Sequence, residues 1–367
     1  MNVLIQLSHP AHFHLYKHVA KNLKEDGHKV FVLIKSKDVL EPLLQEAGLE
    51  YYNINEHAHR GSKWGILWDM LSREARMIVF CLRHRIDLLT GSTPEVAHVG
   101  WLLRRSSINT GEDDLNIVPM FRKIAGPFLQ CLLTPETCNT EPYEDRSVHY
   151  PGYHKLAYLH PNRFIANRDV VEKYGIETSK PYFLLRFAKL GAHHDVGVNG
   201  ISTEVAQHLI DILTPKGKVY ITSERELEPQ FEQYRLRIHP LDIHHVMNYA
   251  TLYIGDSQSM AVEAAMLGVP SLRFNDFVGE KKIGVMEELE HKYGLTFGIS
   301  SKEADRLYDK VNEMLQTEGV REQFQARREV MLKDKIDVTE FLTWFIENYP
   351  NSKADVKQSD FNWGRFR

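Results

Sequence analysis

One short stretch of this sequence combines residue types that can bind an anion. In "YIGDSQSMAVEAAMLGVPSLRF" (253–274), an apolar run ends in a small polar turn, and a helical pattern follows. The start of a helix has N–H groups without intrahelical partners and the positive end of the helix dipole, so it favours a phosphate. Glu263 lies four residues after Ser259 on the same helical face, where it could bind a ribose diol. On spacing alone, the simpler interpretation is favoured, in which a serine caps the helix and Glu263 is solvated.

A second polar loop follows the first apolar run of the chain. "SHPAHFH" (8–14) places His9, His12 and His14 close together. Imidazole titrates near neutral pH, so His12 could act as a general base or as a partner for an anion. Metal binding would need three or four ligands with supporting contacts, and we expect no metal. The alternative is that one or two of these histidines cap the next helix or bind backbone groups.

Two further loops carry charge. "NTGEDD" (109–114) supplies Glu112, Asp113 and Asp114, and clustered carboxylates raise one another's pKa, so that one can become a base. A solvated acidic loop explains any one of these acids equally well.

In "LRFAKLGAHHDVG" (185–197), His193 and His194 could form a His–carboxylate unit with Asp195 beside a phosphate, while Arg186 adds positive charge. The alternative for Arg186 is an ion pair at the sheet edge.

Alternating apolar runs and helical patterns must position these loops. The first fifty-odd residues alternate strand and helix, which indicates an α/β fold with a doubly wound parallel sheet. A second alternation follows Lys180, with strands expected at 181–188, 217–223, 237–240, 251–257 and 269–274. We therefore expect two Rossmann-like domains, 1–160 and 161–345, facing across a cleft. Ligands of such sheets lie at the carboxyl ends of the strands, where the loops above fall. The polar tail 346–367 is expected to be loose or to pack back on the first domain.

Composition excludes several classes of protein. The 367 residues carry a formal net charge of -4, so the basic footprint of a nucleic-acid-binding protein is absent. The N-terminus lacks the features of a signal peptide, and no apolar stretch is long enough to cross a bilayer. The three cysteines lack metal-site spacing and indicate reduced thiols. We expect a cytoplasmic protein, at most peripheral on the inner face of the membrane.

Several motifs resemble a known superfamily. "GDSQSMAVEAAMLGVPSLRF" resembles the donor-binding segment of GT-B enzymes, which include nucleotide-sugar glycosyltransferases and UDP-N-acetylglucosamine 2-epimerases. Those enzymes share a small polar loop, a helix with an inward Glu, and the pattern A-x-x-x-G-x-P, here Ala264, Gly268 and Pro270. To about residue 300 the chain also resembles one uncharacterised family, domain of unknown function 354. The motifs that carry this resemblance are "SHPAHFHLYK", "PGYHKLAYLHP", "LLRF…HHDVG", "ITSE" and "YIGDSQSMAVEAAMLGVP".

The resemblance implies roles for particular residues. Glu263 would bind the ribose, and the helix start would hold the diphosphate through Ser257, Gln258, Ser259 and Met260. Ser223 or Glu224 would line the nucleotide pocket, and His239 would lie near the base. The placement of His12 resembles the loop histidine of the lipid-linked N-acetylglucosaminyl transferases. The segment around His193 differs from the epimerase pattern, so the parallel there is weaker.

Three functions fit these features. The leading one is a GT-B-type glycosyltransferase that uses a UDP sugar as substrate, with no other cofactor, in surface polysaccharide or glycolipid assembly. His12 or Asp113 would be its base, and Arg186 or His194 would help to stabilise the leaving diphosphate. A UDP-sugar 2-epimerase would instead depend on Glu112 and Asp113, and a non-catalytic nucleotide-sugar-binding protein would need no base.

A lipid-linked or glycan acceptor would suit the transferase. Residues 115–132 mix apolar and basic side chains and could lie on a bilayer surface, or equally form a core helix with a solvated basic face. For 64–85 the core helix is the favoured interpretation. The sequence identifies neither the sugar nor the oligomeric state.

Overall fold

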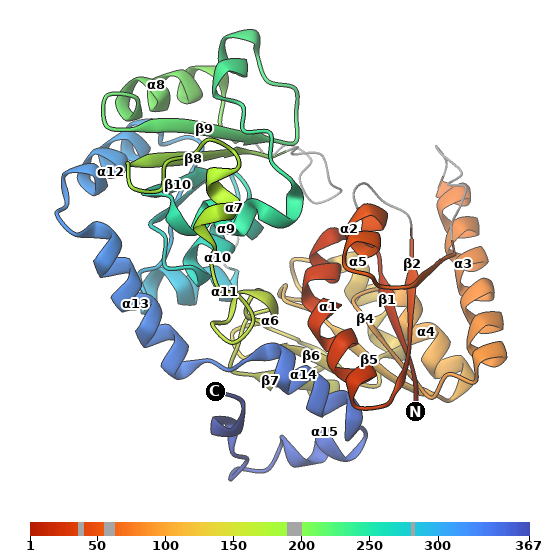
Figure 1. Ribbon diagram of the computed structural model, residues 1–367. Coiled ribbons are helices and arrows are strands. Elements are labelled where there is room, and N and C mark those ends of the chain that lie inside the picture. The colour runs from red at the N-terminus through yellow and green to blue at the C-terminus, as the bar shows by residue number, and fades with distance from the viewer. Residues whose placement is uncertain (36–39, 55–62, 189–199, 280–282) are drawn as a thin grey trace. The chain divides into compact units, whose positions relative to one another are not determined.

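The chain divides into two compact units. The structure, a computed structural model, describes residues 1–35, 40–54, 63–188, 200–279 and 283–367. Unit 1 consists of Met1–His160 and Lys335–Arg367, and unit 2 consists of Pro161–Asp334. Figure 1 shows the elements of both units.

Unit 1 is built on a parallel sheet. Within the described ranges this sheet has seven strands in the order β3-β2-β1-β4-β5-β6-β7. Val3, Leu4 and Ile5 of the first strand are fully buried, as expected for a parallel sheet covered on both faces. The strands are β1 (Asn2–Leu7), β2 (Lys29–Ile34), β3 (Tyr51–Asn53), β4 (Leu88–Gly91), β5 (Ser106–Thr110), β6 (Leu132–Pro135) and β7 (Ser147–Tyr150).

Helices cover this sheet. Pro10 at the first helical position and the His9 side chain, which accepts a hydrogen bond from the Ala11 amide, begin α1, and Gly27 follows its end at φ +84°. Helix α1 packs against α2 and α6, and α3 packs against α4. The helices of this part of the chain are α1 (Pro10–Glu25), α2 (Leu40–Glu46), α3 (Lys63–His84), α4 (Pro94–Leu103), α5 (Pro119–Ile124), η1 (Gly126–Phe128), η2 (Glu144–Arg146) and α6 (Leu156–Leu159).

Unit 2 has a second parallel sheet, with five strands in its described part, ordered β12-β11-β10-β8-β9. The expected strand at 237–240 is wrong: Pro240 has no N–H to donate and begins the short helix η4, and only a single bridge joins Ile221 to Arg235 nearby. The edge strand β12 was missed because it has only three residues. The strands are β8 (Tyr182–Phe187), β9 (Lys218–Ser223), β10 (Leu252–Gly255), β11 (Ser271–Phe274) and β12 (Phe297–Ile299).

Helices lie on both faces of this sheet as well (Figure 1). Helix α8 contacts α12, and α9 contacts α10. The helices are α7 (Arg168–Glu172), α8 (Thr203–Leu213), η3 (Pro229–Tyr234), η4 (Pro240–Asp242), α9 (Ile243–Tyr249), α10 (Gln258–Met266), α11 (Gly284–Glu287), η5 (Glu288–Lys292), α12 (Ala304–Gln316) and α13 (Val320–Asp334).

The C-terminal segment returns to unit 1 at Lys335, ten residues earlier than the boundary of 345 expected from the sequence. Helix α14 (Val338–Glu347) packs against α1 and α6, because its buried face, including Phe341 and Phe345, completes the core of that unit. Periodicity shows that a helix is amphipathic but not which sheet it covers.

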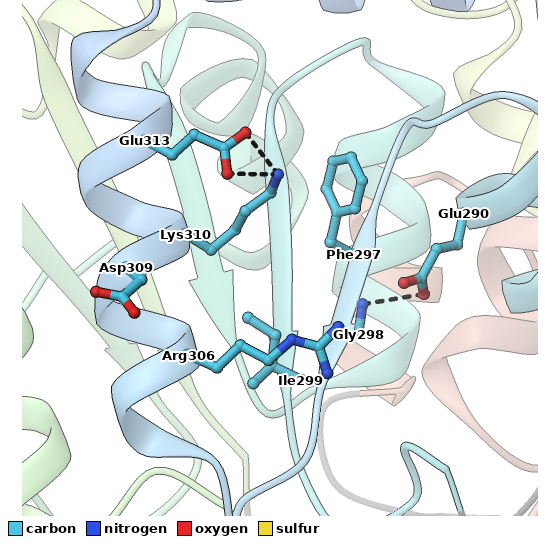
Figure 2. Close-up of a pocket in the computed structure, with 8 residues that line it drawn as sticks. All are labelled: Glu290, Phe297, Gly298, Ile299, Arg306, Asp309, Lys310 and Glu313. Atoms are coloured by element: carbon cyan, nitrogen blue, oxygen red, sulfur yellow. Dashed lines mark hydrogen bonds and ion pairs between the residues drawn. The ribbon is translucent and has the colours of Figure 1, made fainter.

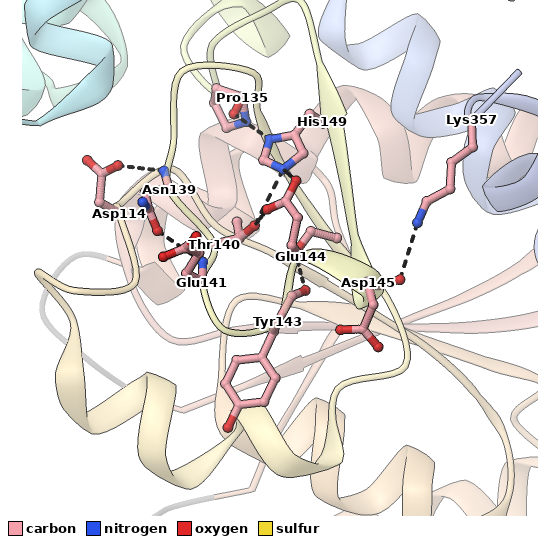
Figure 3. Close-up of polar contacts among 11 residues, drawn as sticks. Asp114, Pro135, Asn139, Thr140, Glu141, Tyr143, Glu144, Asp145, His149 and Lys357 are labelled. Carbon is pink, nitrogen blue, oxygen red and sulfur yellow. Dashed lines mark hydrogen bonds and ion pairs between the residues drawn. The ribbon is translucent and has the colours of Figure 1, made fainter. Parts of the chain in front are cut away.

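The tail continues through α15 (Asn351–Asp355) and η6 (Trp363–Phe366), and it is packed rather than loose. The Phe366 ring lies 5.5 Å from that of Phe341. The ammonium group of Lys357 donates to the carbonyl oxygen of Asp145 at 3.2 Å (Figure 3).

The order of the strands indicates at which edge of each sheet a ligand is expected to bind. In unit 1 the order reverses between β1 and β4, and in unit 2 between β8 and β10. Ligands of doubly wound sheets bind beyond the carboxyl ends of the strands at such a switch point. The loops after β1 and β4, and those after β8 and β10, are therefore where a site is expected.

Candidate functional site

The turn between β10 and α10 lies at the switch point of unit 2. Ser257 caps α10, because its hydroxyl accepts a hydrogen bond from the Met260 amide at 3.4 Å. Gln258 is half-buried, Ser259 is exposed and Met260 is buried. The capping expected on the simpler interpretation is present, and the helix start still presents the N–H groups of its first residues.

Gly255 serves protein packing rather than the approach of a ligand to the backbone. A Cβ atom at this position would meet the hydroxyl of Tyr253 and would lie 2.8 Å from the Cβ of Arg186. Tyr253 itself is fully buried, and within the described residues its hydroxyl has no hydrogen-bond partner. Burial raises the pKa of Tyr253 well above its ordinary value of 10.0, so the hydroxyl stays protonated and can donate. Sequence analysis missed this residue, since a Tyr inside a strand is usually core.

Glu263 lies on α10 beside a histidine that sequence analysis did not select. Its Oε1 is 3.3 Å from Nε2 of His244 on α9, and the two side chains are 12% and 6% exposed, respectively. Glu263 is therefore not a solvated carboxylate. The pair could have been suspected from "DIHH" (242–245), but only the packing of α9 on α10 brings the two side chains together.

Asp256 is the third residue near this turn that was not selected from the sequence. Its carboxylate is 2% exposed and accepts hydrogen bonds from the amides of Ala188, at 2.6 Å, and Ile201, at 3.3 Å. These two residues flank the stretch 189–199, so one carboxylate fixes both ends of the loop after β8. The guanidinium of Arg225 also donates to the Ile201 carbonyl, at 2.6 Å. Burial raises the pKa of Asp256, although the two backbone hydrogen bonds oppose that shift.

The other predicted residues of unit 2 have protein partners. Arg186 forms an ion pair with Glu224, the alternative that the sequence left open. The hydroxyl of Ser223 accepts from the Arg225 amide at 3.1 Å, and the His239 ring accepts from the Leu241 amide at 3.4 Å. His193 and His194 lie outside the described residues, as do Lys189 and Asp195.

Asn275 and Asp276 are also held by the protein. The Asn275 amide donates to the Asp256 carbonyl at 3.0 Å, and Asp276 accepts from the Ser301 hydroxyl. Both side chains are buried. They support the β10–α10 turn and the end of β11.

In unit 1, His12 lies in the first turn of α1, after β1. Its Nδ1 is 3.3 Å from the amide nitrogen and 3.4 Å from the hydroxyl of Ser8, and the ring is half-buried. His9 caps the helix, so one of the loop histidines has the capping role considered above. The bond from the Ser8 amide to Nδ1 forms in the neutral tautomer whose ring proton is on Nε2.

Glu112 does not have the environment of a base with a raised pKa. Its carboxylate accepts from the His154 amide at 2.6 Å and from the ammonium group of Lys155. Burial acts to raise the pKa of Glu112, but the charge of Lys155 and these hydrogen bonds outweigh it and lower the pKa. Burial also lowers the pKa of His154 to about 4, so this imidazole is neutral at pH 7. The expectation that clustered carboxylates raise one another's pKa is therefore wrong for Glu112.

The two aspartates that follow Glu112 differ in burial. Asp114 is 5% exposed and accepts from the Asn139 amide at 2.6 Å, which holds the loop after β6 (Figure 3). Asp113 is exposed. One buried acid fixes a loop, and its neighbour faces solvent.

A hydrogen-bonded group of hydroxyls lies where β4 and β5 end. The Tyr16 hydroxyl is 2.8 Å from that of Thr90 and 3.1 Å from that of Thr110, which is in turn 2.8 Å from the hydroxyl of Ser92. Buried Gln6 on β1 accepts from the Thr93 hydroxyl. None of these side chains was selected from the sequence. A buried Gln in an apolar strand is the signal that could have pointed to this edge.

Most apolar residues of the segment 115–132 are buried or half-buried. Leu115, Ala125 and Leu129 join a cluster with Ala97 of α4, whereas Met120 is 66% exposed. No helix of the described ranges is long and apolar enough to cross a membrane. Over the same ranges, no group of three or more His, Cys, Asp or Glu side chains could hold a metal ion.

A separate pocket of about 310 Å³ lies against β12 and α12 (Figure 2). Its charged side chains bind groups of the protein itself: Lys310 donates to Glu313 at 2.8 and 2.9 Å, and Glu290 accepts from the Gly298 amide at 3.0 Å. It contains none of the residues selected from the sequence.

Several solved structures are similar to this chain over most of its length. The S. aureus MnaA–UDP co-structure matches with 14% identity and a TM-score of 0.67, over 98% of this chain and 100% of that one. The spinosyn rhamnosyltransferase SpnG complexed with spinosyn aglycone matches with 15% identity and a TM-score of 0.60, over 94% and 100%. UDP-GlcNAc 2-epimerase from Neisseria meningitidis bound to UDP-GlcNAc matches with 14% identity and a TM-score of 0.57, over 91% and 99%.

At these identities the likeness shows the fold alone, and the predicted GT-B-like α/β fold is confirmed. No protein-family model matches the sequence. No curated protein matches it significantly. The resemblance to domain of unknown function 354 therefore stays a prediction.

The Lys155–Glu112 pair generates a pH prediction. Replacing Glu112→Gln leaves a buried ammonium without its charge partner, so we expect about 3 kcal/mol of stability to be lost at pH 7. Because the pKa of Glu112 is lowered by folding, its contribution is present above the ordinary value of 4.5 and is lost as the pH falls through the folded value. Urea unfolding of both proteins between pH 7 and pH 3 should show the difference shrinking. The exposed Glu141→Gln is the control. If Glu112→Gln kept the stability of the wild-type protein but lost enzymatic turnover, Glu112 would instead be identified as a base.

The Asp256 carboxylate generates a second prediction. Asp256→Asn keeps one acceptor oxygen and replaces the other with a donor, so one of the two amides loses its partner. Hydrogen bonds to charged groups contribute about 1.5–3 kcal/mol, which corresponds to roughly tenfold or faster amide exchange at Ala188 or Ile201. Hydrogen exchange read by NMR measures this, with exposed Asp211→Asn as control. Unchanged exchange at both amides would show that Asp256 does not hold the loop ends.

Proposed function

We propose that this protein is an enzyme that acts on a nucleotide sugar, with UDP as the nucleotide, and that it catalyses glycosyl transfer. The observation that carries this is the β10–α10 turn. There, the capped start of α10, the buried Tyr253 hydroxyl and the paired carboxylate of Glu263 lie on adjoining elements at a topological switch point. A diphosphate needs N–H donors and positive potential, which the helix start supplies.

Glu263 suits recognition of the ribose. Its carboxylate offers acceptor positions beyond the one near His244, and a ribose diol presents two hydroxyl donors. Partial burial strengthens such hydrogen bonds because water competes less. His244 would hold the carboxylate in place.

The transfer step needs a proton acceptor. The acceptor hydroxyl would attack the anomeric carbon of the sugar, its proton would pass to a base, and the bond from that carbon to the diphosphate would break. We assign the base role to His12. In the tautomer whose Nδ1–H donates to the Ser8 hydroxyl, 3.4 Å away, Nε2 carries no proton and can accept the one that the acceptor hydroxyl loses. Residues of unit 2 would stabilise the charge on the departing diphosphate. This stabilisation is expected to lower the activation barrier more than the base does.

His12 is preferred over the acids of the 109–114 loop for an electrostatic reason. Glu112 is a weak base because Lys155 and the His154 amide hold it ionised. Asp113 is exposed, so solvent stabilises its charge. An imidazole, whose ordinary pKa lies near neutral pH, suits proton transfer better than either carboxylate.

A 2-epimerase is the second candidate, favoured by the UDP-GlcNAc 2-epimerase among the similar structures. It would use the same nucleotide site but would move a proton at the second carbon of the sugar. The lowered pKa of Glu112 counts against that chemistry at this residue. For the transferase we further propose that the acceptor is a lipid-linked compound or a glycan. We also propose that the chain belongs to the family called domain of unknown function 354.

Nucleotide binding tests the donor site. We expect UDP to bind the wild-type protein and Glu263→Gln to weaken it about tenfold, as for loss of a charged hydrogen bond. Calorimetric titration should also show that 2′-deoxy-UDP binds the wild type more weakly than UDP, and that the variant loses this preference. Exposed Glu313→Gln, whose carboxylate pairs with Lys310, is the control. Equal affinity of wild type and Glu263→Gln for both ligands would refute the ribose assignment.

Turnover separates the candidate activities. NMR of the protein with a panel of UDP sugars should show no epimer, and should show UDP release only when a glycan or lipid-linked acceptor is added. His12→Asn should lower kcat about a hundredfold or more while the Kd for UDP stays unchanged. His9→Asn is the matched control, since Asn also caps a helix. An epimer formed without acceptor would establish the second candidate, and tight binding without turnover would indicate a non-catalytic protein.

A further inference from the structure

Helix α3 has two apolar faces, and within the described part of the chain one of them is covered. Met77 and Cys81 are buried in a cluster with Val96 and Val99 of α4. On the opposite side, Trp68 is 66% exposed, Leu71 47%, Val79 64% and Leu82 60%, and Ala75 between them is exposed too. The sequence had favoured a solvated basic face for 64–85, so the exposed apolar face corrects that expectation.

These five side chains form one continuous stripe. At about 100° per residue, positions 68, 71, 75, 79 and 82 fall within an arc of roughly 80° on the side away from Met77. Helix α3 lies on the outer side of unit 1, with α4 against its inner side (Figure 1). Contiguous exposed apolar surface of this kind marks an interaction site.

The spacing of the stripe is symmetric about Ala75. Two large apolar residues lie seven and four positions before it, and two more lie four and seven positions after it. Read in either direction, the stripe is therefore large, large, small, large, large. A two-fold axis through Ala75 would place the stripe of one antiparallel helix against an identical stripe, with the small residues at the crossing point. Such self-complementarity is what an isologous interface requires.

The charges beside the stripe are complementary in the same arrangement. Asp69, Arg76 and Arg83 lie on the same flank of α3, within about 40° around the helix. The Arg76 guanidinium donates to the Ile54 carbonyl of its own chain at 2.7 Å, which leaves Asp69 and Arg83 as the pair to consider. With Ala75 opposite Ala75, residue 69 of one copy faces residue 81 of the other, so Arg83 lies about 3 Å further along the axis. In antiparallel helices the same flanks meet, which would pair Asp69 of each copy with Arg83 of the other.

We propose that α3 pairs with α3 of a second copy of this chain, antiparallel and centred on Ala75, to form a homodimer through unit 1. The stripe alone is smaller than the roughly 800 Å² per partner of a standard interface. Trp101 and Leu102, 56% and 58% exposed on the adjacent α4, would extend it. An anionic bilayer fits less well, since the flank carries Asp69 besides Arg76 and Arg83, whereas membrane-surface helices have polar faces without acids.

Sedimentation and a cysteine probe test the pairing. The wild-type protein should sediment as a dimer at micromolar concentration, and Ala75→Arg should sediment as a monomer with an unchanged circular dichroism spectrum, because residue 75 is exposed in each chain. Ala75→Cys should form a disulfide-linked dimer on mild oxidation, because the two introduced thiols would meet at the axis and Cys81, Cys131 and Cys138 are buried. Val330→Arg and Val330→Cys, at a 55% exposed position of α13, are the matched controls.

A charge exchange distinguishes the dimer from other occupants of this face. Asp69→Arg or Arg83→Asp alone should weaken the dimer severalfold, and the two changes together should restore it. A monomeric wild type, a dimer that persists in Ala75→Arg, or no rescue by the double exchange would overturn the proposal. So would binding to vesicles of anionic phospholipid that Ala75→Arg abolishes while the wild-type protein remains monomeric.

Discussion

Burial of parallel strands on both faces is the constraint on which the other features of this protein depend. A parallel strand needs a crossover to reach its neighbour, and the crossover helices cover the sheet, so the strands are apolar and their interiors hold few polar groups. Val3 and Leu4 of β1 are fully buried, and so are Leu184 and Leu185 of β8. Polar chemistry is therefore confined to the carboxyl ends of the strands, and within those ends to the point where the strand order reverses.

At the carboxyl edge of unit 2, most polar side chains support the protein itself. Asp256 holds two amides, Asn275 holds the Asp256 carbonyl, and Arg186 pairs with Glu224. Buried polar groups without partners are costly, so these contacts are expected, and they make the turn rigid. Tyr253 is an exception, because its buried hydroxyl has no hydrogen-bond partner among the described residues. A rigid turn that carries one such donor is consistent with a preorganised ligand site.

The fold was largely predictable, and the roles of the site residues were less so. The strand over 2–7 and the helix ended by Gly27 follow from short-range patterns, and the structure has both. A cap by Ser257 or Ser259 was expected from position alone, and Ser257 is the one that caps α10. Glu112 was misjudged, since "GEDD" shows three neighbouring acids but not Lys155, which lies 43 positions away and sets the pKa.

The sequence by itself determined the periodicities, the turns and the position of each polar loop at a strand end, because these depend on residues a few positions apart. It therefore specified the α/β class and the two sheets. The tertiary structure decided which side chains meet: His244 with Glu263, Asp256 with the ends of the loop after β8, and α14 with unit 1. It also decided which apolar face of α3 is buried and which is exposed. Hydrophobicity acts without direction, so a sequence records that a face is apolar, and only packing selects what covers it.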